Sequence, residues 1–248
     1  MKILVCISHV PDTTSKINFT EDGTKFDANG VQFVINPYDE FALTRAMWFK
    51  EKQGATVTVA SVGSALVEPT LRKALAIGAD DAVRVDSEPF DGYYVAKQLS
   101  EVIKTEGYDL VLMGKESIDY NGGMVPGMLA ELLGFNFVNA CIGLDIDNNS
   151  ASAIREIDGG KEVLKCSLPL IAAGQKGMVE EKDLRIPNMR GIMMARKKPL
   201  KVVAPVDFSA TTTTVRYEKP EAKGACKLVD ATNIDELIQL LHNEAKVI

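Results

Sequence analysis

The first half of the chain alternates short apolar segments with longer amphipathic ones, and this pattern restricts the possible folds most. Strands that alternate with helices along a chain form a parallel sheet with helices on both faces. The sequence therefore predicts an α/β fold with a doubly wound, mostly parallel sheet. The predicted core strands are residues 2–7, 55–61, 82–85, 109–113 and 169–173, and the helices of the first half are residues 36–53, 67–77, 92–104 and 124–133.

The second half changes character. Residues 153–157 and 163–167 flank an Asp-Gly-Gly turn, which predicts a β-hairpin. Residues 230–245 form a predicted helix with one leucine stripe, and a terminal helix beyond a linker often packs on another molecule. The alternative is that it packs on its own domain. We therefore divide the chain into an α/β nucleotide-binding domain, residues 1–205, and a linker with a helical arm, residues 206–248.

Composition excludes several classes of protein. The net charge of −6 argues against general nucleic-acid binding, and no segment approaches the ~20 apolar residues of a membrane span. Four cysteines are scattered without a CxxC pair, so we expect neither a disulfide framework nor a metal site. No secretory signal is visible. These features predict a cytoplasmic protein without membrane insertion.

The chain lacks the residues of common catalytic sites. It has two histidines, His9 and His242, and neither belongs to an HExxH motif; no GxSxG motif is present. His9 follows the first predicted strand, where ligand sites of α/β proteins form, but a lone histidine there is more often a loop residue. We therefore predict no catalytic residue.

Several predicted strand ends carry polar or glycine-rich segments that would meet at one edge of the sheet. These segments are residues 6–10, 36–39, 62–64 and 114–130. Gly122, Gly123 and Gly127 lie just before or within a predicted helix start, where backbone N–H groups approach anions. This pattern suggests a nucleotide site, although such loops are often only tight turns.

Residues 183–200 are basic and rich in methionine, in a chain that is acidic overall. The segment contains five basic residues and one acidic residue, with three methionines and two isoleucines among them. Methionine side chains adapt to partners of different shape, and positive charge speeds encounter with acidic surfaces. The segment is therefore either a docking surface or a core helix with a solvated basic end.

Two motifs in these segments resemble those of a known family. Arg155-Glu-Ile-Asp-Gly-Gly-Lys-Glu162, followed by Leu168-Pro169, is similar to the R-E-[IV]-D-G-G-x-E…L-P signature of electron transfer flavoprotein β subunits, bacterial type. The run from Arg185 to Lys197 resembles the recognition loop of that family. The resemblance extends from the first strand to the C-terminus and implies an adenine-nucleotide α-hydrolase-like sheet with a hairpin, a docking loop and a C-terminal arm.

The resemblance also implies that this subunit binds an adenine nucleotide, usually AMP. Two features depart from the family pattern: Met124 stands where a glutamine is expected, and Pro126 has no N–H to offer a phosphate. The cofactor-binding positions that it implies are Cys6, Asn36, Pro37, Tyr38, Asp39, Val62, Asp119, Tyr120, Asn121, Gly122, Gly123, Met124, Val125, Pro126, Gly127, Met128, Leu129 and Ala130.

The same resemblance implies a heterodimer in which FAD is held mainly by an α subunit or shared with it. Electrons would pass from acyl-CoA-type dehydrogenases of fatty acid oxidation through FAD to a downstream redox acceptor. Met189 matches the family's apolar docking anchor. The implied partner-docking residues are Arg185, Met189, Arg190, Met193, Arg196, Lys197 and Lys198.

Two alternatives remain open at this level. The Pro11-Asp12-Thr13 version of the first loop resembles electron-bifurcating relatives, which carry a second FAD in place of AMP. The Asp158-Gly159-Gly160 hairpin instead resembles the conventional branch. The second alternative is a stand-alone adenine-nucleotide sensor of the universal-stress type, which would need neither the basic methionine-rich segment nor the C-terminal arm.

Overall fold

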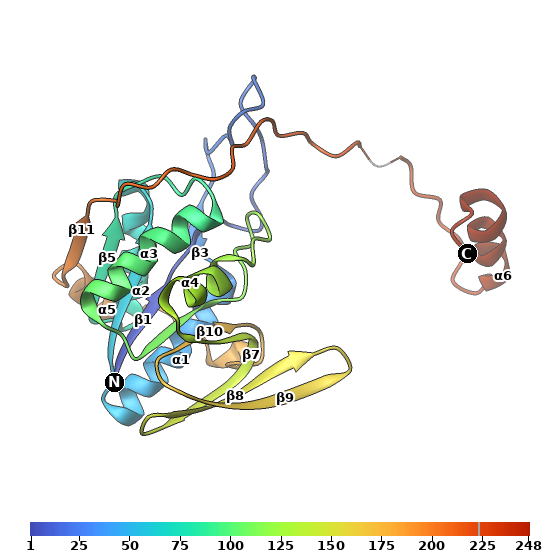
Figure 1. The fold of residues 1–248 in the computed structure, drawn as a ribbon. Helices are drawn as coiled ribbons and strands as arrows, with labels where there is room; N and C mark the ends of the chain where they lie inside the picture. The colour runs from blue at the N-terminus through green and yellow to red at the C-terminus, as the bar shows by residue number, and fades with distance from the viewer. Residues whose placement is uncertain (223) are drawn as a thin grey trace.

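The computed structural model describes residues 1–222 and 224–248 and contains a nine-stranded sheet (Figure 1). Its strand order is β11-β5-β4-β1-β6-β10-β7-β8-β9, and the pairs from β11 through β7 are parallel. The strands are β1 (Lys2–Cys6), β4 (Thr56–Val62), β5 (Asp81–Val85), β6 (Leu110–Gly114), β7 (Asn136–Asp147), β8 (Ser150–Ile157), β9 (Gly160–Ser167), β10 (Leu170–Gly174) and β11 (Leu200–Val203).

Helices cover both faces of the sheet, as predicted for a doubly wound fold. On one face, α1 (Pro37–Gln53) and α2 (Glu68–Ile77) pack on alternate strand residues such as Val5 and Val59. On the other face, α3 (Gly92–Glu106) and α4 (Val125–Leu133) pack on the intervening residues, such as Leu4. Successive side chains of a strand point to opposite faces, so each buried strand contributes to two separate cores.

The predicted limits of the first helix are confirmed. Asn36 precedes α1, Pro37 occupies its first turn, and Gly54 ends it with a φ of 67°. That left-handed conformation favours glycine because a Cβ atom is crowded there. The start of α1 lies next to the carboxyl ends of β1 and β6, because the N–H groups of Ser8 and Gly114 donate to Asp39 in its first turn.

The sheet is larger than the five strands predicted. β11 extends one side by pairing with β5, and β7 was missed although it spans residues 136–147. Its sequence, NFVNACIGLDID, mixes apolar residues with asparagine, glycine and aspartate, which are poor strand formers. β7 pairs in parallel with β10 and then antiparallel with β8, and its register shifts near Cys141. The predicted hairpin is confirmed as β8 and β9.

The segment that follows β1 in the chain forms a second, small sheet. β2 (His9–Pro11) pairs antiparallel with β3 (Phe33–Ile35), and the loop between them turns at Gly23. The His9 ring stacks on Phe33 with centroids 4.4 Å apart, and its Nδ1 lies 2.8 Å from the Thr70 hydroxyl. Burial lowers the pKa of His9. These contacts give His9 a structural role.

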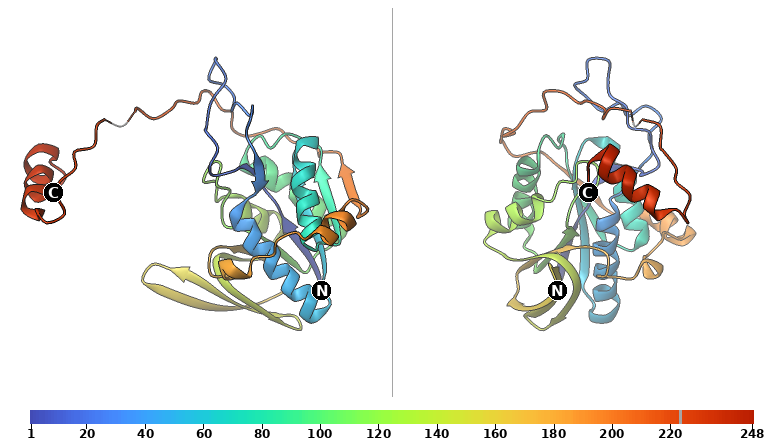
Figure 2. Two further views of the ribbon diagram at one scale, coloured as in Figure 1. Left: turned by 180° about the vertical axis from the view of Figure 1, so that it is seen from behind. Right: turned by 90° about the vertical axis from the view of Figure 1, so that its right-hand side faces the viewer.

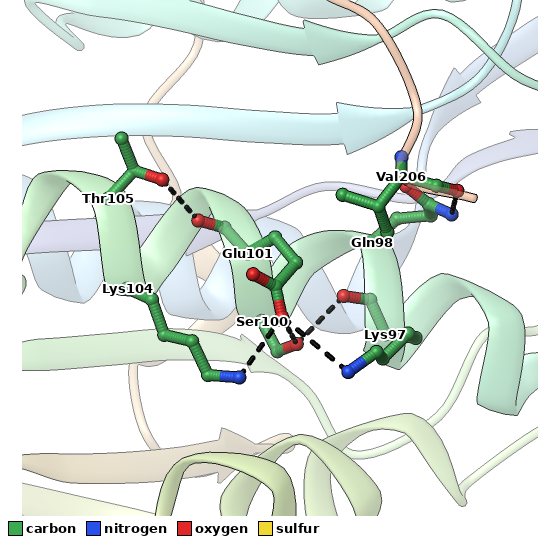
Figure 3. Close-up of polar contacts among 7 residues, drawn as sticks. All are labelled: Lys97, Gln98, Ser100, Glu101, Lys104, Thr105 and Val206. Carbon is green, nitrogen blue, oxygen red and sulfur yellow. Dashed lines mark hydrogen bonds and ion pairs between the residues drawn. The ribbon is translucent and has the colours of Figure 1, made fainter. Parts of the chain in front are cut away.

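The C-terminal segment first follows the domain and then leaves it (Figures 1 and 2). The Gln98 amide of α3 donates to the Val206 carbonyl at 3.0 Å and accepts from the Val206 N–H at 2.8 Å (Figure 3). The arm ends in α6 (Ile234–Gln239) and η3 (Leu240–Ala245), neither of which contains a buried residue. Across the described ranges, no helix is both long and apolar enough to cross a membrane.

Candidate functional site

The carboxyl ends of β1, β4 and β6 meet at one edge of the sheet, where α/β proteins bind their ligands. Cys6 and Val62 end two of these strands, and both side chains are buried. Burial, followed by the charge of Asp39, raises the pKa of the Cys6 thiol, so it stays protonated. The two residues form the apolar floor of the candidate site.

Asp39 and Asn36 join three loops at this edge. The Asp39 carboxylate is 2% exposed and accepts N–H groups of Ser8 and Gly114, each at 2.7 Å. Asn36 donates from Nδ2 to the Glu116 carbonyl at 2.8 Å. These polar atoms are therefore engaged with the protein backbone. The contacts give both residues a supporting role, and their direct contact with a nucleotide stays a prediction.

Gly114 allows the first turn of α1 to approach the end of β6. A Cβ atom at Gly114 would lie 2.5 Å from Cβ of Tyr38 and 2.6 Å from Oδ1 of Asp39. Pro37 and Tyr38 remain partly exposed beside it. Burial, and next the Glu116 carboxylate, raise the pKa of the Tyr38 hydroxyl. Any side chain larger than hydrogen at Gly114 would push α1 away from the edge.

Lys115 is a site residue that sequence reasoning missed. It directly follows β6, and its Nζ lies 5.3 Å from the centre of the Tyr38 ring. The side chain is half-buried, so the cation is held near the strand ends rather than extended into solvent. In the sequence, the feature that could have identified Lys115 is its position directly after a strand that ends in glycine.

The loop that contains residues 117–124 is closed by its own contacts. Ser117 pairs with Gly122, the Ser117 hydroxyl donates to Asp119, and the Tyr120 N–H donates to the same carboxylate at 3.0 Å. Asn121 has a φ of 49°, and an added Cβ at Gly122 would meet no atom within 4 Å. There is space beside Gly122, but its N–H donates to the Ser117 carbonyl at 3.2 Å and its carbonyl accepts the Ser117 N–H at 3.1 Å. The Asp119 carboxylate is likewise used within the turn.

The N-terminus of α4 follows this loop. Val125 and Gly127 lie in its first turn, where amides have no intrahelical acceptor, and Pro126 contributes none. Met124 packs over the start of α3, since an added Cβ at Gly92 would lie 2.8 Å from its Cγ and Sδ atoms. The predicted site residues Met128, Leu129 and Ala130 continue α4, and Leu129 and Ala130 are buried in the core.

The basic methionine-rich segment forms a short helix, α5 (Met189–Ala195), where an extended loop was predicted. The Asn188 side chain explains the difference, because it caps the helix by accepting the Gly191 N–H at 2.8 Å. Met189 is 75% exposed and Met193 is 68% exposed, whereas Ala195 is buried. The segment is therefore an exposed surface and not a core helix.

The five basic residues of this segment do not share one environment. Arg190, Arg196 and Lys197 are exposed. Arg185 instead pairs with Glu51 of α1 at 2.6 Å, and Lys198 donates to the carbonyls of Leu75 and Ala79 at 2.9 and 2.5 Å. The prediction that all five charges face a partner is thus corrected for Lys198, whose ammonium group points toward α2.

The nine-stranded, mostly parallel sheet with helices on both faces defines a doubly wound α/β protein, a class that binds ligands at the carboxyl ends of its strands. The sequence model of the electron transfer flavoprotein domain matches residues 23–208. "Electron transfer flavoprotein subunit beta" of Bacillus subtilis is 36% identical, with both chains fully covered. The Syntrophomonas wolfei protein of that name is 35% identical over this whole chain and 98% of its own. The chain belongs to the electron transfer flavoprotein β-subunit family.

A further relative bears on the compartment. "Electron transfer flavoprotein subunit beta, mitochondrial" of Arabidopsis thaliana is 33% identical, with both chains fully covered. Relatives with and without a mitochondrial name therefore share the whole length of this chain. Family membership does not fix the compartment, and a cytoplasmic location stays a prediction.

Proposed function

We propose that this chain is the β half of a heterodimeric electron transfer flavoprotein. Its arm binds an α subunit, and its α5 surface binds acyl-CoA-type dehydrogenases. Electrons pass from the dehydrogenase through FAD at the subunit junction to a downstream redox acceptor. The observation that carries the proposal is that α5 and α6 expose apolar side chains, on a chain of this family. FAD supplies the redox chemistry, and this chain supplies binding surfaces.

The candidate nucleotide site fits AMP in its backbone geometry. The first-turn amides of Val125 and Gly127 suit a phosphate, and Lys115 adds a cation beside Tyr38 at the same edge of the sheet. The apolar floor at Cys6 and the exposed part of Tyr38 suit a base or ribose. In this proposal Asn36 and Asp39 hold the loops in place, while their neighbours contact the ligand.

A second FAD in place of AMP is the alternative, and the Pro11-Asp12-Thr13 loop favours it by resemblance. Co-expression with the candidate α chain, followed by denaturation and quantification of released cofactors, separates the two. We expect one FAD and one AMP for each heterodimer. Two FAD molecules without AMP would establish the bifurcating form. A colourless chain that binds no α subunit would contradict both and favour the stand-alone sensor, for which family membership gives no support.

Met189 is the proposed anchor of the docking surface. It lies in the first turn of α5, and the exposed charges of Arg190, Arg196 and Lys197 surround the same short helix. Interfaces often depend on a few apolar anchors, while peripheral charges mainly change the rate of encounter. The arrangement therefore assigns affinity to Met189 and salt-dependent association to the three cations.

Met189→Ala is expected to weaken docking without changing FAD content. Losing a buried methionine side chain costs about 2 kcal/mol, so the dehydrogenase concentration for half-maximal FAD reduction should rise roughly 30-fold. Stopped-flow reduction of the heterodimer by the dehydrogenase measures this effect. Met189→Leu, which keeps a similar volume, is the matched control and should stay near wild type. Equal kinetics for all three proteins would remove Met189 from the docking site.

A further inference from the structure

The helices α2 and α5 hold each other through contacts that run in both directions. Arg72 of α2 donates from Nη1 to the carbonyls of Ala195 and Lys198, at 2.8 and 2.7 Å. Lys198, just beyond α5, donates from Nζ to the carbonyls of Leu75 and Ala79, at 2.9 and 2.5 Å. The last carbonyls of a helix have no intrahelical partner. Each helix therefore receives its C-terminal donors from the other.

A close backbone approach supports the same arrangement. A Cβ atom at Gly191 would lie 2.2 Å from the Ala76 carbonyl oxygen, so α5 crosses α2 at backbone contact distance. Ala195, one turn later, is buried in the core. The two helices pack against each other, and the view from behind in Figure 2 shows them next to one another. α5 is thus fixed by its backbone as well as by the two basic side chains.

The other end of the segment is also attached. The Arg185 guanidinium pairs with Glu51 at 2.6 Å, and the Arg185 backbone N–H donates to the Thr44 hydroxyl at 3.1 Å, so this end is held on α1. Between the two attachments, Ile186, Met189 and Met193 are exposed. The apolar side chains are therefore presented by a segment that is held at both ends and contributes little to the core itself.

We propose that Arg72 and Lys198 are positioning residues for docking. They hold α5 in the orientation that presents Met189 before a partner arrives. Ordering a binding segment in advance strengthens binding because less conformational entropy is lost on association. Neither residue needs to touch the partner. The inference rests on the proposed docking function, which Met189→Ala tests separately.

The test uses Arg72→Met and Lys198→Met in the full heterodimer, each of which keeps an apolar stem and removes the donors. Hydrogen–deuterium exchange reads the order of α5 in the absence of a dehydrogenase. Losing these hydrogen bonds should speed exchange of the α5 amides roughly tenfold and raise the half-saturating dehydrogenase concentration about tenfold. The limiting rate of FAD reduction should not change. Arg72→Lys, which keeps a charged donor, should return both the α5 exchange rate and the half-saturating dehydrogenase concentration part of the way to the wild-type values.

Controls separate positioning from charge. Lys73→Met removes one positive charge from the same helix, but Lys73 pairs with Glu40 and not with α5. It should leave both measurements unchanged. The Lys198→Met effect should also persist at high salt, whereas the effect of a steering charge fades with screening. Unchanged α5 exchange, or faster exchange with normal half-saturation, would overturn the positioning role while leaving the docking role of Met189 standing.

Discussion

Replacing Ile234, Leu237 and Ile238 together with serine is expected to separate this chain from its α subunit. The three side chains are between 45% and 63% exposed, and no residue of α6 is buried. If the α subunit buries them, each contributes about 1.5 kcal/mol, so the triple variant should bind roughly 1,000-fold more weakly. Sedimentation of the co-expressed pair, with FAD absorbance recorded across the boundary, measures the loss of complex.

The same variant should leave the free chain folded. α6 lies apart from the sheet, so its apolar residues do not stabilise the α/β domain (Figures 1 and 2). The melting temperature of the isolated chain should therefore match that of the wild type. Gln239→Ala, at the end of the same helix, is the control and should keep the complex. An intact heterodimer from the triple variant would show that the arm is not the attachment.

Asp39→Ala is expected to give the largest loss of stability in the candidate site, together with loss of the nucleotide. It leaves the buried N–H groups of Ser8 and Gly114 without an acceptor. Each unsatisfied group costs about 1–3 kcal/mol, which gives a total of about 2–6 kcal/mol for the two. For a chain of this size the melting temperature should fall by roughly 4–24 °C. Thermal unfolding and quantification of released AMP measure the two effects.

A control variant in the neighbouring loop tests whether Asp39 stabilises the protein by joining the strand-end loops or merely by its charge. Asp119→Ala also removes a carboxylate from the candidate site, but this carboxylate contacts only Ser117 and Tyr120 within its own turn. It should change stability by no more than about 1 kcal/mol. Equal destabilisation by both variants would contradict the idea that Asp39 joins the strand-end loops.

Asp39 also makes a pH-dependent contribution to stability. Burial raises the pKa of its carboxyl to about 7, while the N–H groups of Ser8 and Gly114 oppose that rise. The folded state then binds the proton more tightly than the unfolded state, where the pKa is about 3.9. This contribution is complete below pH ~4 and is lost as the pH rises toward 7, with a slope of at most about 1.4 kcal/mol per pH unit.

The sign of that dependence can be measured by difference. Asp39→Asn cannot titrate, so the free energy of unfolding of the wild type, relative to that variant, should fall between about pH 4 and pH 7. Urea unfolding across that range gives the two curves. A difference that rises with pH would mean that the folded protein stabilises the Asp39 carboxylate rather than the acid.

Much of the fold follows from local patterns that are visible in the sequence. Alternating apolar and amphipathic segments predict the parallel sheet, and Asn36, Pro37 and Gly54 predict both ends of α1. β7 was not predicted, because its residues favour a strand only when β10 and β8 lie beside it. The Asn188 cap similarly produces α5 in a segment that was expected to be an extended loop.

By itself, the sequence determined the class of fold, the family signatures and the presence of a basic, methionine-rich segment, because these depend on residue order and local periodicity. The tertiary structure decided which polar atoms remain available for a ligand or partner. Asp39 meets Gly114 across 75 residues, and Lys198 meets Leu75 across 123. Only the folded backbone brings such groups together, so composition could count these charges but could not assign their contacts.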